Sequence, residues 1–278
     1  MSFIFNEILV RPIINILLAI YQILFAIHVP YALGFSIIIL TVIIRFILYP
    51  LTASQLKASK KMQQIAPHLS HLKQKHKGDA KRIQQETMKL YKEHGVNPAA
   101  GCLPIVIQLP IIWALYSVLQ KVVGLPPSTL VSEVNKLAYS FDFLKLSRPW
   151  DQYFFGIPLG QNPSGLLKVM PLIMLVPAIT AFLQFIQSKM MFSKPKEQAL
   201  MEQGIEKIKK QPKKEEDFAA AFQKQSLYIF PVMIGFFSYS FPIGLSLYWN
   251  TFTLFGILQQ YKIQGLGGLE EWIKKKKK

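Results

Sequence analysis

Hydrophobic residues in this chain are gathered into long blocks, and this feature constrains its fold more than any other. Hydrophobic residues make up 51% of the 278 positions. The blocks cover residues 31–52, 99–122, 167–188 and 226–262. A helix needs about 20 apolar residues to cross the hydrocarbon core of a bilayer. Composition therefore favours an all-α, polytopic membrane protein over a soluble globular one.

The last block is too long for one crossing at roughly 1.5 Å per residue. It contains the turn sequence Ser-Phe-Pro-Ile-Gly at residues 240–244, so it is expected to form two helices. We therefore expect five transmembrane helices. The predicted parts are an N-terminal interfacial helix (1–29), spans at 30–55, 98–122, 167–188, 226–243 and 244–262, a cytoplasmic helical hairpin (56–97), an external loop (123–166), a cytoplasmic loop (189–225) and a basic cytoplasmic tail (263–278).

The N-terminal stretch from Pro12 to His28 is apolar but only marginally long enough to cross a bilayer. It carries Asn15 and Gln22 within its length. These features favour a helix that lies in the membrane interface. A sixth span or an uncleaved signal anchor is the alternative. No small-residue cleavage motif follows a short apolar region, so no removable signal peptide is expected.

Charge distribution predicts the orientation. Residues 56–97 carry ten Lys and Arg against three Asp and Glu, so this loop is expected in the cytoplasm. With five spans, residues 189–225 and the tail fall on the same side, and both are rich in Lys. The N-terminus is then outside. The tail ends in five lysines that could contact anionic lipid or ribosomal RNA: Lys274, Lys275, Lys276, Lys277 and Lys278.

The first cytoplasmic loop predicts two antiparallel helices. Its apolar residues follow a spacing of three and four on either side of a Lys-Gly-Asp turn at 77–79. Pro67 is expected to kink the first helix. We interpret the hairpin as an arm that projects from the membrane. The two faces are Met62, Ile65, Leu69 and Leu72, and then Ala80, Ile83, Thr87, Leu90 and His94.

Arg45 lies inside the apolar sequence TVIIRFILYP, and the predicted spans contain no Asp or Glu to neutralise it. A cation at membrane depth costs about 3 kcal/mol or more, so such residues usually face water or a partner. The alternative is that Arg45 reaches the headgroups near the Lys57 end of its segment. We expect a guanidinium bathed by water in a cleft of half depth, open on one side.

Uncharged polar residues are spread over the other spans. Each one alone is most simply a group that joins two helices, for about 0.6 kcal/mol. Together with Arg45 they could line one hydrated groove open to the cytoplasm. They are Gln108, Ser117, Gln120, Thr180, Gln184, Gln187, Ser238, Ser240, Asn250, Thr251 and Thr253.

The sequence offers no support for catalysis or for a bound cofactor. Cys102 is the single cysteine, which excludes an intrachain disulfide and a Cys-pair metal site. His68 and His71 have the spacing of a weak metal pair, but solvated surface residues explain them better. We therefore expect neither an enzyme, nor a metal, nor a cofactor, nor a small-molecule substrate.

Several motifs in order resemble the YidC/Oxa/Alb membrane protein insertases. They are TVIIRFILYPLT, YKEHGVNPAAGCLPIVIQLPI, FIQSKMM and FPIGLSLYWNTFTLFGILQQ. The resemblance covers residues 30–262 and implies five spans around a groove open to cytoplasm and lipid, a cytoplasmic hairpin, and insertion or folding of membrane proteins without ATP. By position it implies groove roles for Arg45 and Gln187, and a substrate contact at Trp249 beside Tyr248. The expected groove residues are thus Arg45, Gln108, Gln184, Gln187, Tyr248, Trp249 and Asn250.

The chain departs from parts of that family. We expect no large external domain before the five-span region, so the chain resembles the shorter bacterial members, and we find in it no lipobox Cys of the kind that many of those carry. The loop at 189–225 is longer and more charged than a minimal member needs. The resemblance implies the bacterial cytoplasmic membrane, and a thylakoid relative would have a similar sequence. It implies nascent membrane proteins as partners, and it leaves the ribosome and the Sec translocon as candidates.

Two other functional classes fit part of the same pattern. A small-solute transporter or channel also places polar residues inside a helical bundle, although it would normally show inverted repeats. A membrane assembly factor that does not translocate needs the lipid-facing surface but no wet groove.

Overall fold

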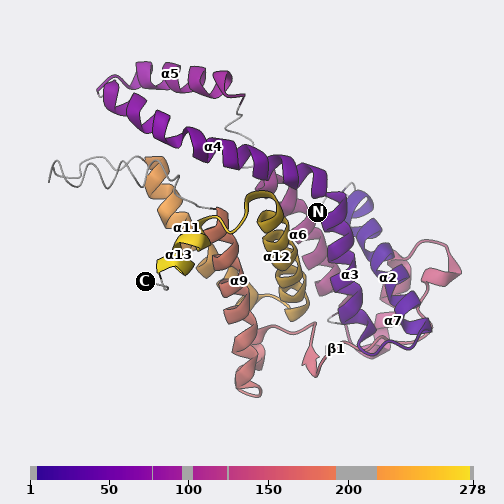
Figure 1. Ribbon diagram of the computed structural model, residues 1–278. Helices are drawn as coiled ribbons and strands as arrows, with labels where there is room; N and C mark the ends of the chain where they lie inside the picture. The colour runs from indigo at the N-terminus through magenta and orange to yellow at the C-terminus, as the bar shows by residue number, and fades with distance from the viewer. Residues whose placement is uncertain (1–4, 77, 96–102, 124, 192–217, 276–278) are drawn as a thin grey trace. The chain divides into compact units, whose positions relative to one another are not determined.

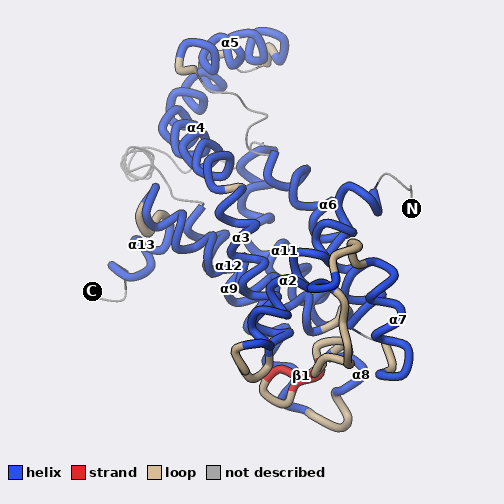
Figure 2. The backbone as a smooth tube through the Cα atoms, turned by 90° about the vertical axis from the view of Figure 1, so that its right-hand side faces the viewer, coloured by secondary structure: helices blue, strands red, loops and turns tan. Residues whose placement is uncertain are grey.

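The computed structural model describes residues 5–76, 78–95, 103–123, 125–191 and 218–275 (Figure 1). The described chain is mostly helical, as the composition predicts. Its two short strands stand out in the tube view (Figure 2). The chain forms two compact units. The first contains Met1–Leu48, Ile105–Phe185 and Phe230–Gly256, and the second contains Tyr49–Pro104, Ile186–Ile229 and Ile257–Lys278.

The elements follow the apolar blocks, with additions in the predicted external loop. The α-helices are α2 (Arg11–Ala26), α3 (Ala32–Ile47), α4 (Tyr49–Lys75), α5 (Ala80–Glu93), α6 (Leu103–Val118), α7 (Pro127–Leu137), α8 (Pro163–Leu166), α9 (Leu175–Met191), α11 (Phe218–Ser240), α12 (Ile243–Gln264) and α13 (Gly268–Lys275). Short π-helices cover Asn6–Val10 and Leu119–Val123, and 3-10 turns cover Asp142–Leu144 and Pro171–Met174. Strands β1 (Tyr153–Phe154) and β2 (Ile157–Pro158) pair antiparallel.

Two helices in the described part of the chain are long and apolar enough to cross a membrane. They are Asn6–Ala26 and Pro171–Met191, and the bent pair Ala32–Ile47 with Tyr49–Ala66 is a third if it forms one span. Gln108–Val118 and Leu227–Ser240 are shorter apolar helices. The count of five spans therefore stays a prediction. The break between α11 and α12 falls at Phe241–Pro242, inside the turn that the sequence predicts.

The core of the first unit forms where α2 packs on α3. Ile14 and Leu18 of α2 are fully buried, as is Leu33 of α3. Close packing of such side chains stabilises the unit through many small dispersion contacts. The opposite side of α2 is also apolar, but Ile16 and Ile23 are 41% and 54% exposed. This helix thus has one apolar face in the core and a second on the surface.

The predicted external loop is more structured than expected, because it packs along α2. Helix α7 contacts α2 in both views (Figures 1 and 2). Asn15 donates to the carbonyl of Leu137 (3.1 Å) and accepts from the backbone N–H of Tyr139 (2.7 Å). Gln22 donates to the carbonyl of Lys145 (2.8 Å). Asn15 and Gln22 of α2 therefore hold the irregular segment that follows α7.

The β1–β2 hairpin covers the start of α3. The ring of Phe154 lies so close to Gly34 that a Cβ there would stand 2.0 Å from the ring. Tyr31 and Phe35 also meet Phe154 edge to face, at centroid distances of 6.1 and 5.3 Å. A glycine is needed at position 34 because this aromatic cluster leaves no room for a side chain.

In the second unit, α4 and α5 form the antiparallel hairpin that the 3-4 spacing predicts. Gly78 takes a φ of +96°, and Asp79 caps α5 by accepting from the N–H of Arg82 (2.9 Å). Helix α4 continues through Pro67. The predicted apolar face of α5 is partly wrong, because Ala80 and His94 are exposed at its two ends.

Candidate functional site

Arg45 lies in the last turn of α3 and is 4% exposed. Its Nε donates to the carbonyl of Phe252 on α12 (3.0 Å), and Nη2 donates to the same oxygen. The guanidinium carbon lies 3.4 Å from the centroid of the Phe252 ring and 5.9 Å from that of Phe255. One residue of α12 therefore supplies both an acceptor and an aromatic face to the cation.

The expectation that water bathes Arg45 is wrong for this conformation. The guanidinium is packed against protein, because a carbonyl and two rings take the place of solvent. A cation over an aromatic ring gains about 2 kcal/mol when it is desolvated. None of the ion pairs among the described residues involves Arg45. Its charge is thus held by dipoles and rings and is not neutralised by a carboxylate.

A second polar contact joins α6 to α12. Gln108 donates through Nε2 to the hydroxyl of Tyr248 at 2.8 Å. Tyr248 is completely buried, and Gln108 is half-buried. A buried hydroxyl without a partner would cost about 1–3 kcal/mol, so this bond fixes the position of the ring.

Polar side chains also join α9 to α12, once directly and once through Ser238 of α11. Trp249 donates through Nε1 to Oε1 of Gln184 at 3.3 Å. Ser238 of α11 bonds both Ser246 of α12 (2.8 Å) and Thr180 of α9 (3.2 Å). These three hydroxyls join α9, α11 and α12, as small polar residues do between membrane helices.

The structure brings five of the seven predicted groove residues into direct contact with α12 or places them on it with a partner: Arg45, Gln108, Gln184, Tyr248 and Trp249. Asn250 also lies on α12, and its Oδ1 is buried without a partner among the described residues. Gln187 is half-buried on α9 and belongs to the second unit. Lys274 and Lys275 lie in α13, whereas Lys276, Lys277 and Lys278 lie outside the described residues.

Sequence reasoning missed Phe252 at this site and two buried glutamines of the second unit. Phe252 gives no signal, because a phenylalanine in an apolar helix looks like any lipid-facing residue. Gln259 and Gln260 end the motif LFGILQQ and are only 3% and 1% exposed. Two adjacent glutamines in an apolar helix are a visible signal, but their place near the helix end suggests exposure.

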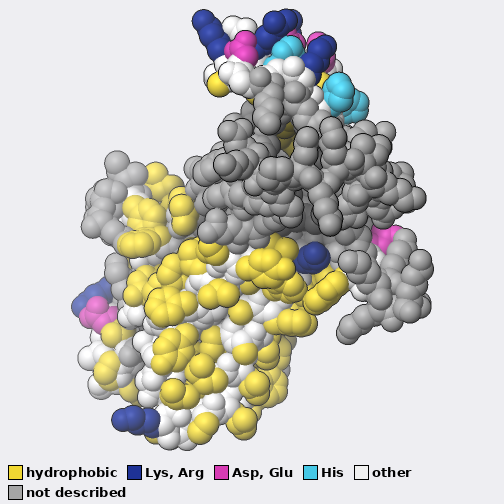
Figure 3. Space-filling model, turned by 90° about the vertical axis from the view of Figure 1, so that its left-hand side faces the viewer, with side chains coloured by type: hydrophobic (Ala, Val, Ile, Leu, Met, Phe, Trp, Pro, Cys, Tyr) yellow, Lys and Arg dark blue, Asp and Glu magenta, His cyan; other side chains and the backbone are white. Residues whose placement is uncertain are grey.

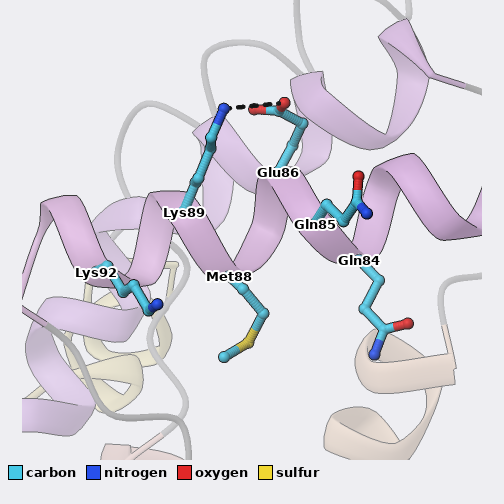
Figure 4. A pocket seen from close by; sticks show the side chains of 6 residues that line it. All are labelled: Gln84, Gln85, Glu86, Met88, Lys89 and Lys92. Carbon is cyan, nitrogen blue, oxygen red and sulfur yellow. Dashed lines mark ion pairs between the residues drawn. The ribbon is translucent and has the colours of Figure 1, made fainter.

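The described residues hold no group of three or more His, Cys, Asp or Glu that could bind a metal. The rings of His68 and His94 lie 6.2 Å apart on the α4–α5 hairpin, and both are exposed. Side chains of α5 line a hollow of about 450 Å³ (Figure 4). It is lined by polar side chains with one methionine: Gln84, Gln85, Glu86, Met88, Lys89 and Lys92.

Large hydrophobic side chains gather on one face of the molecule (Figure 3). In the first unit, Ile179 and Phe182 of α9 are 49% and 60% exposed, and Val232 and Phe236 of α11 are 71% and 63% exposed. Exposed apolar surface of this kind is typical of helices that face lipid.

Comparison with known proteins gives a consistent result. The family described as "60Kd inner membrane protein" matches residues 23–267. The membrane protein insertase YidC of Fusobacterium nucleatum is 33% identical over 234 residues, which cover 84% of this chain and 87% of the relative. YidC 2 of Bacillus anthracis is 33% identical over 237 residues, 84% of this chain and 72% of the relative. The chloroplast protein ALBINO3 of Arabidopsis thaliana is 32% identical over 262 residues, and the match covers 87% of this chain but 49% of that protein.

Proposed function

Because the chain belongs to the 60Kd inner membrane protein family, we propose that it is a membrane protein insertase of the bacterial cytoplasmic membrane. It inserts hydrophobic segments of other membrane proteins and helps them fold, and it uses no ATP. Relatives that are about a third identical over most of the chain are named insertases, which supports this function.

The observation that carries the proposal is the burial of the Arg45 guanidinium against Phe252. Its cation is 4% exposed and is held by the Phe252 carbonyl and ring. A buried cation costs several kcal/mol unless it gains compensating contacts. We propose that an acidic group of a substrate replaces the contacts with Phe252, because a charge-assisted bond to a carboxylate is stronger than one to a neutral carbonyl.

The groove forms along α12 when this helix moves away from α3. Asn250 Oδ1 and Thr253 Oγ1 are buried without partners among the described residues, so both gain hydrogen bonds from water or substrate. Tyr248 and Trp249 lie on the same helix, and Gln108 and Gln184 bond to them from α6 and α9. A hydrated groove shortens the distance that a polar flank travels through hydrocarbon, and the cost of a charge falls near the interface.

Two forces drive the substrate without a nucleotide. Its apolar segment gains about 25 cal/mol per Å² of surface removed from water. The apolar segment of the substrate leaves the groove along the exposed apolar side chains of α9 and α11, such as Phe182 and Phe236. The membrane potential adds about 2.3 kcal/mol per charge per 100 mV and favours outward movement of acidic flanks.

The N-terminal helix α2 lies in the outer interface in this proposal. The irregular segment 137–150 follows α2 along its length, from Asn15 to Phe25, where Arg148 lies 4.0 Å from the Phe25 ring. Irregular backbone with charged side chains does not occur against lipid in the hydrocarbon region. This packing supports an interfacial helix over a sixth span. The N-terminus is then outside and the C-terminus is in the cytoplasm.

The basic hairpin and tail act on the cytoplasmic side. Helix α5 carries Lys81, Arg82, Lys89 and Lys92 on an exposed surface. We assign to the hairpin the capture of nascent membrane proteins, and to the tail contacts with anionic lipids or the ribosome. The Sec translocon is a further partner in this proposal.

Reconstitution tests the function directly. The purified protein in liposomes, supplied with a single-span substrate and no ATP, is expected to raise the fraction of substrate whose flank is protected from protease. Liposomes without the protein give the background. Equal protection in both samples would refute the proposal.

A further inference from the structure

Two buried amide side chains in the second unit have hydrogen-bonding atoms without partners. Gln260 of α12 is 1% exposed, and both its Nε2 and its Oε1 lack a partner among the described residues. Gln55 of α4 is 7% exposed, and its Nε2 also lacks one. Buried polar groups are hydrogen-bonded in the great majority of cases, so unpartnered amide atoms on two helices that bond to each other point to a ligand.

The neighbouring side chains show where these amides lie. Gln259 donates to the carbonyl of Tyr49 (3.3 Å) and to the hydroxyl of Thr52 (2.6 Å). Gln264 donates to the carbonyl of Leu56. Gln260 lies on α12 between these two contacts.

On α4, Gln55 lies between the same two contacts, one turn after Thr52 and directly before Leu56. The unpartnered amides therefore occupy the stretch between two bonds that join α4 to α12. These bonds fix the helices on either side of the amides, so the site is built into the fold and does not depend on a loop.

We propose that Gln260 and Gln55 form a binding site for the extended polypeptide backbone of an arriving substrate. The inference rests on the proposed insertase function and adds a site to it. The amide of Gln260 has one donor face and one acceptor atom, the same pair that a peptide group presents. A residue in extended conformation directs its N–H and C=O to the same edge, so one residue satisfies both atoms of Gln260.

The site at Gln55 and Gln260 recognises a different chemical group from the site at Arg45. Gln55 and Gln260 are uncharged, so they do not select carboxylates. A helical segment cannot bind, because its backbone groups already bond within the helix. The site therefore recognises what all substrates share, a backbone that has not yet formed its own hydrogen bonds, whereas Arg45 recognises acidic flanks.

The test combines a change in the protein with a change in the substrate backbone. Gln260→Leu keeps the size of the side chain and removes both polar atoms. A substrate with one ester in place of an amide in its polar flank lacks one N–H donor. Wild-type protein is expected to insert the ester substrate about fivefold more slowly, as for the loss of one hydrogen bond. Gln260→Leu is expected to insert amide and ester substrates equally slowly.

Gln63→Leu is the matched control, because this other glutamine of α4 already bonds within the protein, to the carbonyl of Met191. It is expected to keep the difference between amide and ester substrates. Circular dichroism during heating shows whether each variant is folded, and Gln55→Leu gives a second variant in case Gln260→Leu is not. Gln55→Leu removes a donor that would bond the carbonyl of the substrate, and an ester carbonyl is a weaker acceptor than an amide carbonyl. This variant is therefore expected to show a smaller rate difference between amide and ester substrates than the wild type.

Three outcomes are decisive. An ester effect that is as large in Gln260→Leu as in the wild type overturns the site. So does a Gln260→Leu variant that inserts amide substrates at the wild-type rate and melts at a higher temperature, since the amide then held only water. A wild-type protein that inserts nothing above liposomes alone refutes the insertase function itself, which is a different result.

Discussion

At the scale of single residues, the structure explains how an unneutralised arginine persists in an apolar helix. The cation of Arg45 meets a carbonyl and a ring of the same residue, Phe252. The arrangement satisfies the cation without a permanent acid, and it leaves the charge able to exchange partners. A carboxylate in place of Phe252 would hold the cation more tightly and would block that exchange.

We predict that Arg45→Ala lowers insertion of substrates with acidic flanks at least about tenfold, the effect of losing one charge-assisted hydrogen bond. Substrates with neutral flanks lose much less. Protease protection in liposomes measures both. An Arg45→Ala variant that inserts acidic substrates like the wild type would remove Arg45 from the mechanism.

Arg45→Lys separates charge from stacking. Lysine keeps the cation but lacks the planar group that lies on the Phe252 ring. We expect this variant to insert acidic substrates at close to the wild-type rate and to unfold at a lower temperature. Loss of insertion with unchanged thermal stability would show that geometry, and not charge, decides the activity.

At the scale of elements, the contact between the β1–β2 hairpin and α3 is a place where volume decides stability. We predict that Gly34→Ala destabilises the protein by about 1–3 kcal/mol, because its Cβ would overlap the ring of Phe154. A lower Tm in a thermal scan is the expected result. Gly165→Ala is the control, since no atom lies within 4 Å of that position. Equal effects of the two changes would contradict the role of the aromatic cluster.

The elements also show which parts of the fold local sequence patterns can predict. The hairpin of α4 and α5 follows from local information, because its turn and its apolar spacing lie within residues 62–94. Helix α7 and the β1–β2 hairpin were not predicted. The backbone at and just after the end of α7 bonds Asn15 of α2, and Phe154 of β1 packs on Tyr31 and Phe35, in each case more than a hundred positions away. Such distant partners leave no local pattern in the sequence.

The same limit applies to the site. Arg45 is evident from sequence because a charge in an apolar block is rare. Its burial is not evident, because it depends on where α12 places Phe252. The polar residues of the spans gave candidates for a groove, and the structure shows which pairs meet: Gln108 with Tyr248, and Gln184 with Trp249.

At the scale of the whole molecule, orientation in the membrane is open to a direct measurement. In a Cys102→Ser background, we predict that Lys145→Cys reacts with a charged maleimide only from outside the cell. Lys89→Cys on α5 is expected to react only from the cytoplasm. Reaction of both from one side would contradict the five-span topology and the interfacial α2.

Water access along the groove distinguishes the functional classes. We predict that cysteines at Gln187 and Trp249, again without Cys102, react with water-soluble reagents from the cytoplasmic side only. Access from both sides would indicate a channel. Access from neither side, also in the presence of substrate, would indicate an assembly factor without a groove.

The bonds of Asn15 impose an order on the biogenesis of this protein. Its partners, Leu137 and Tyr139, are 122 and 124 positions further along the chain. At about 5–20 residues per second, a ribosome reaches them several seconds after it has made Asn15. During that interval α2 exists without the segment that covers it. The side chains of Asn15 and Gln22 therefore need temporary hydrogen-bond partners until the ribosome has made residues 137–145.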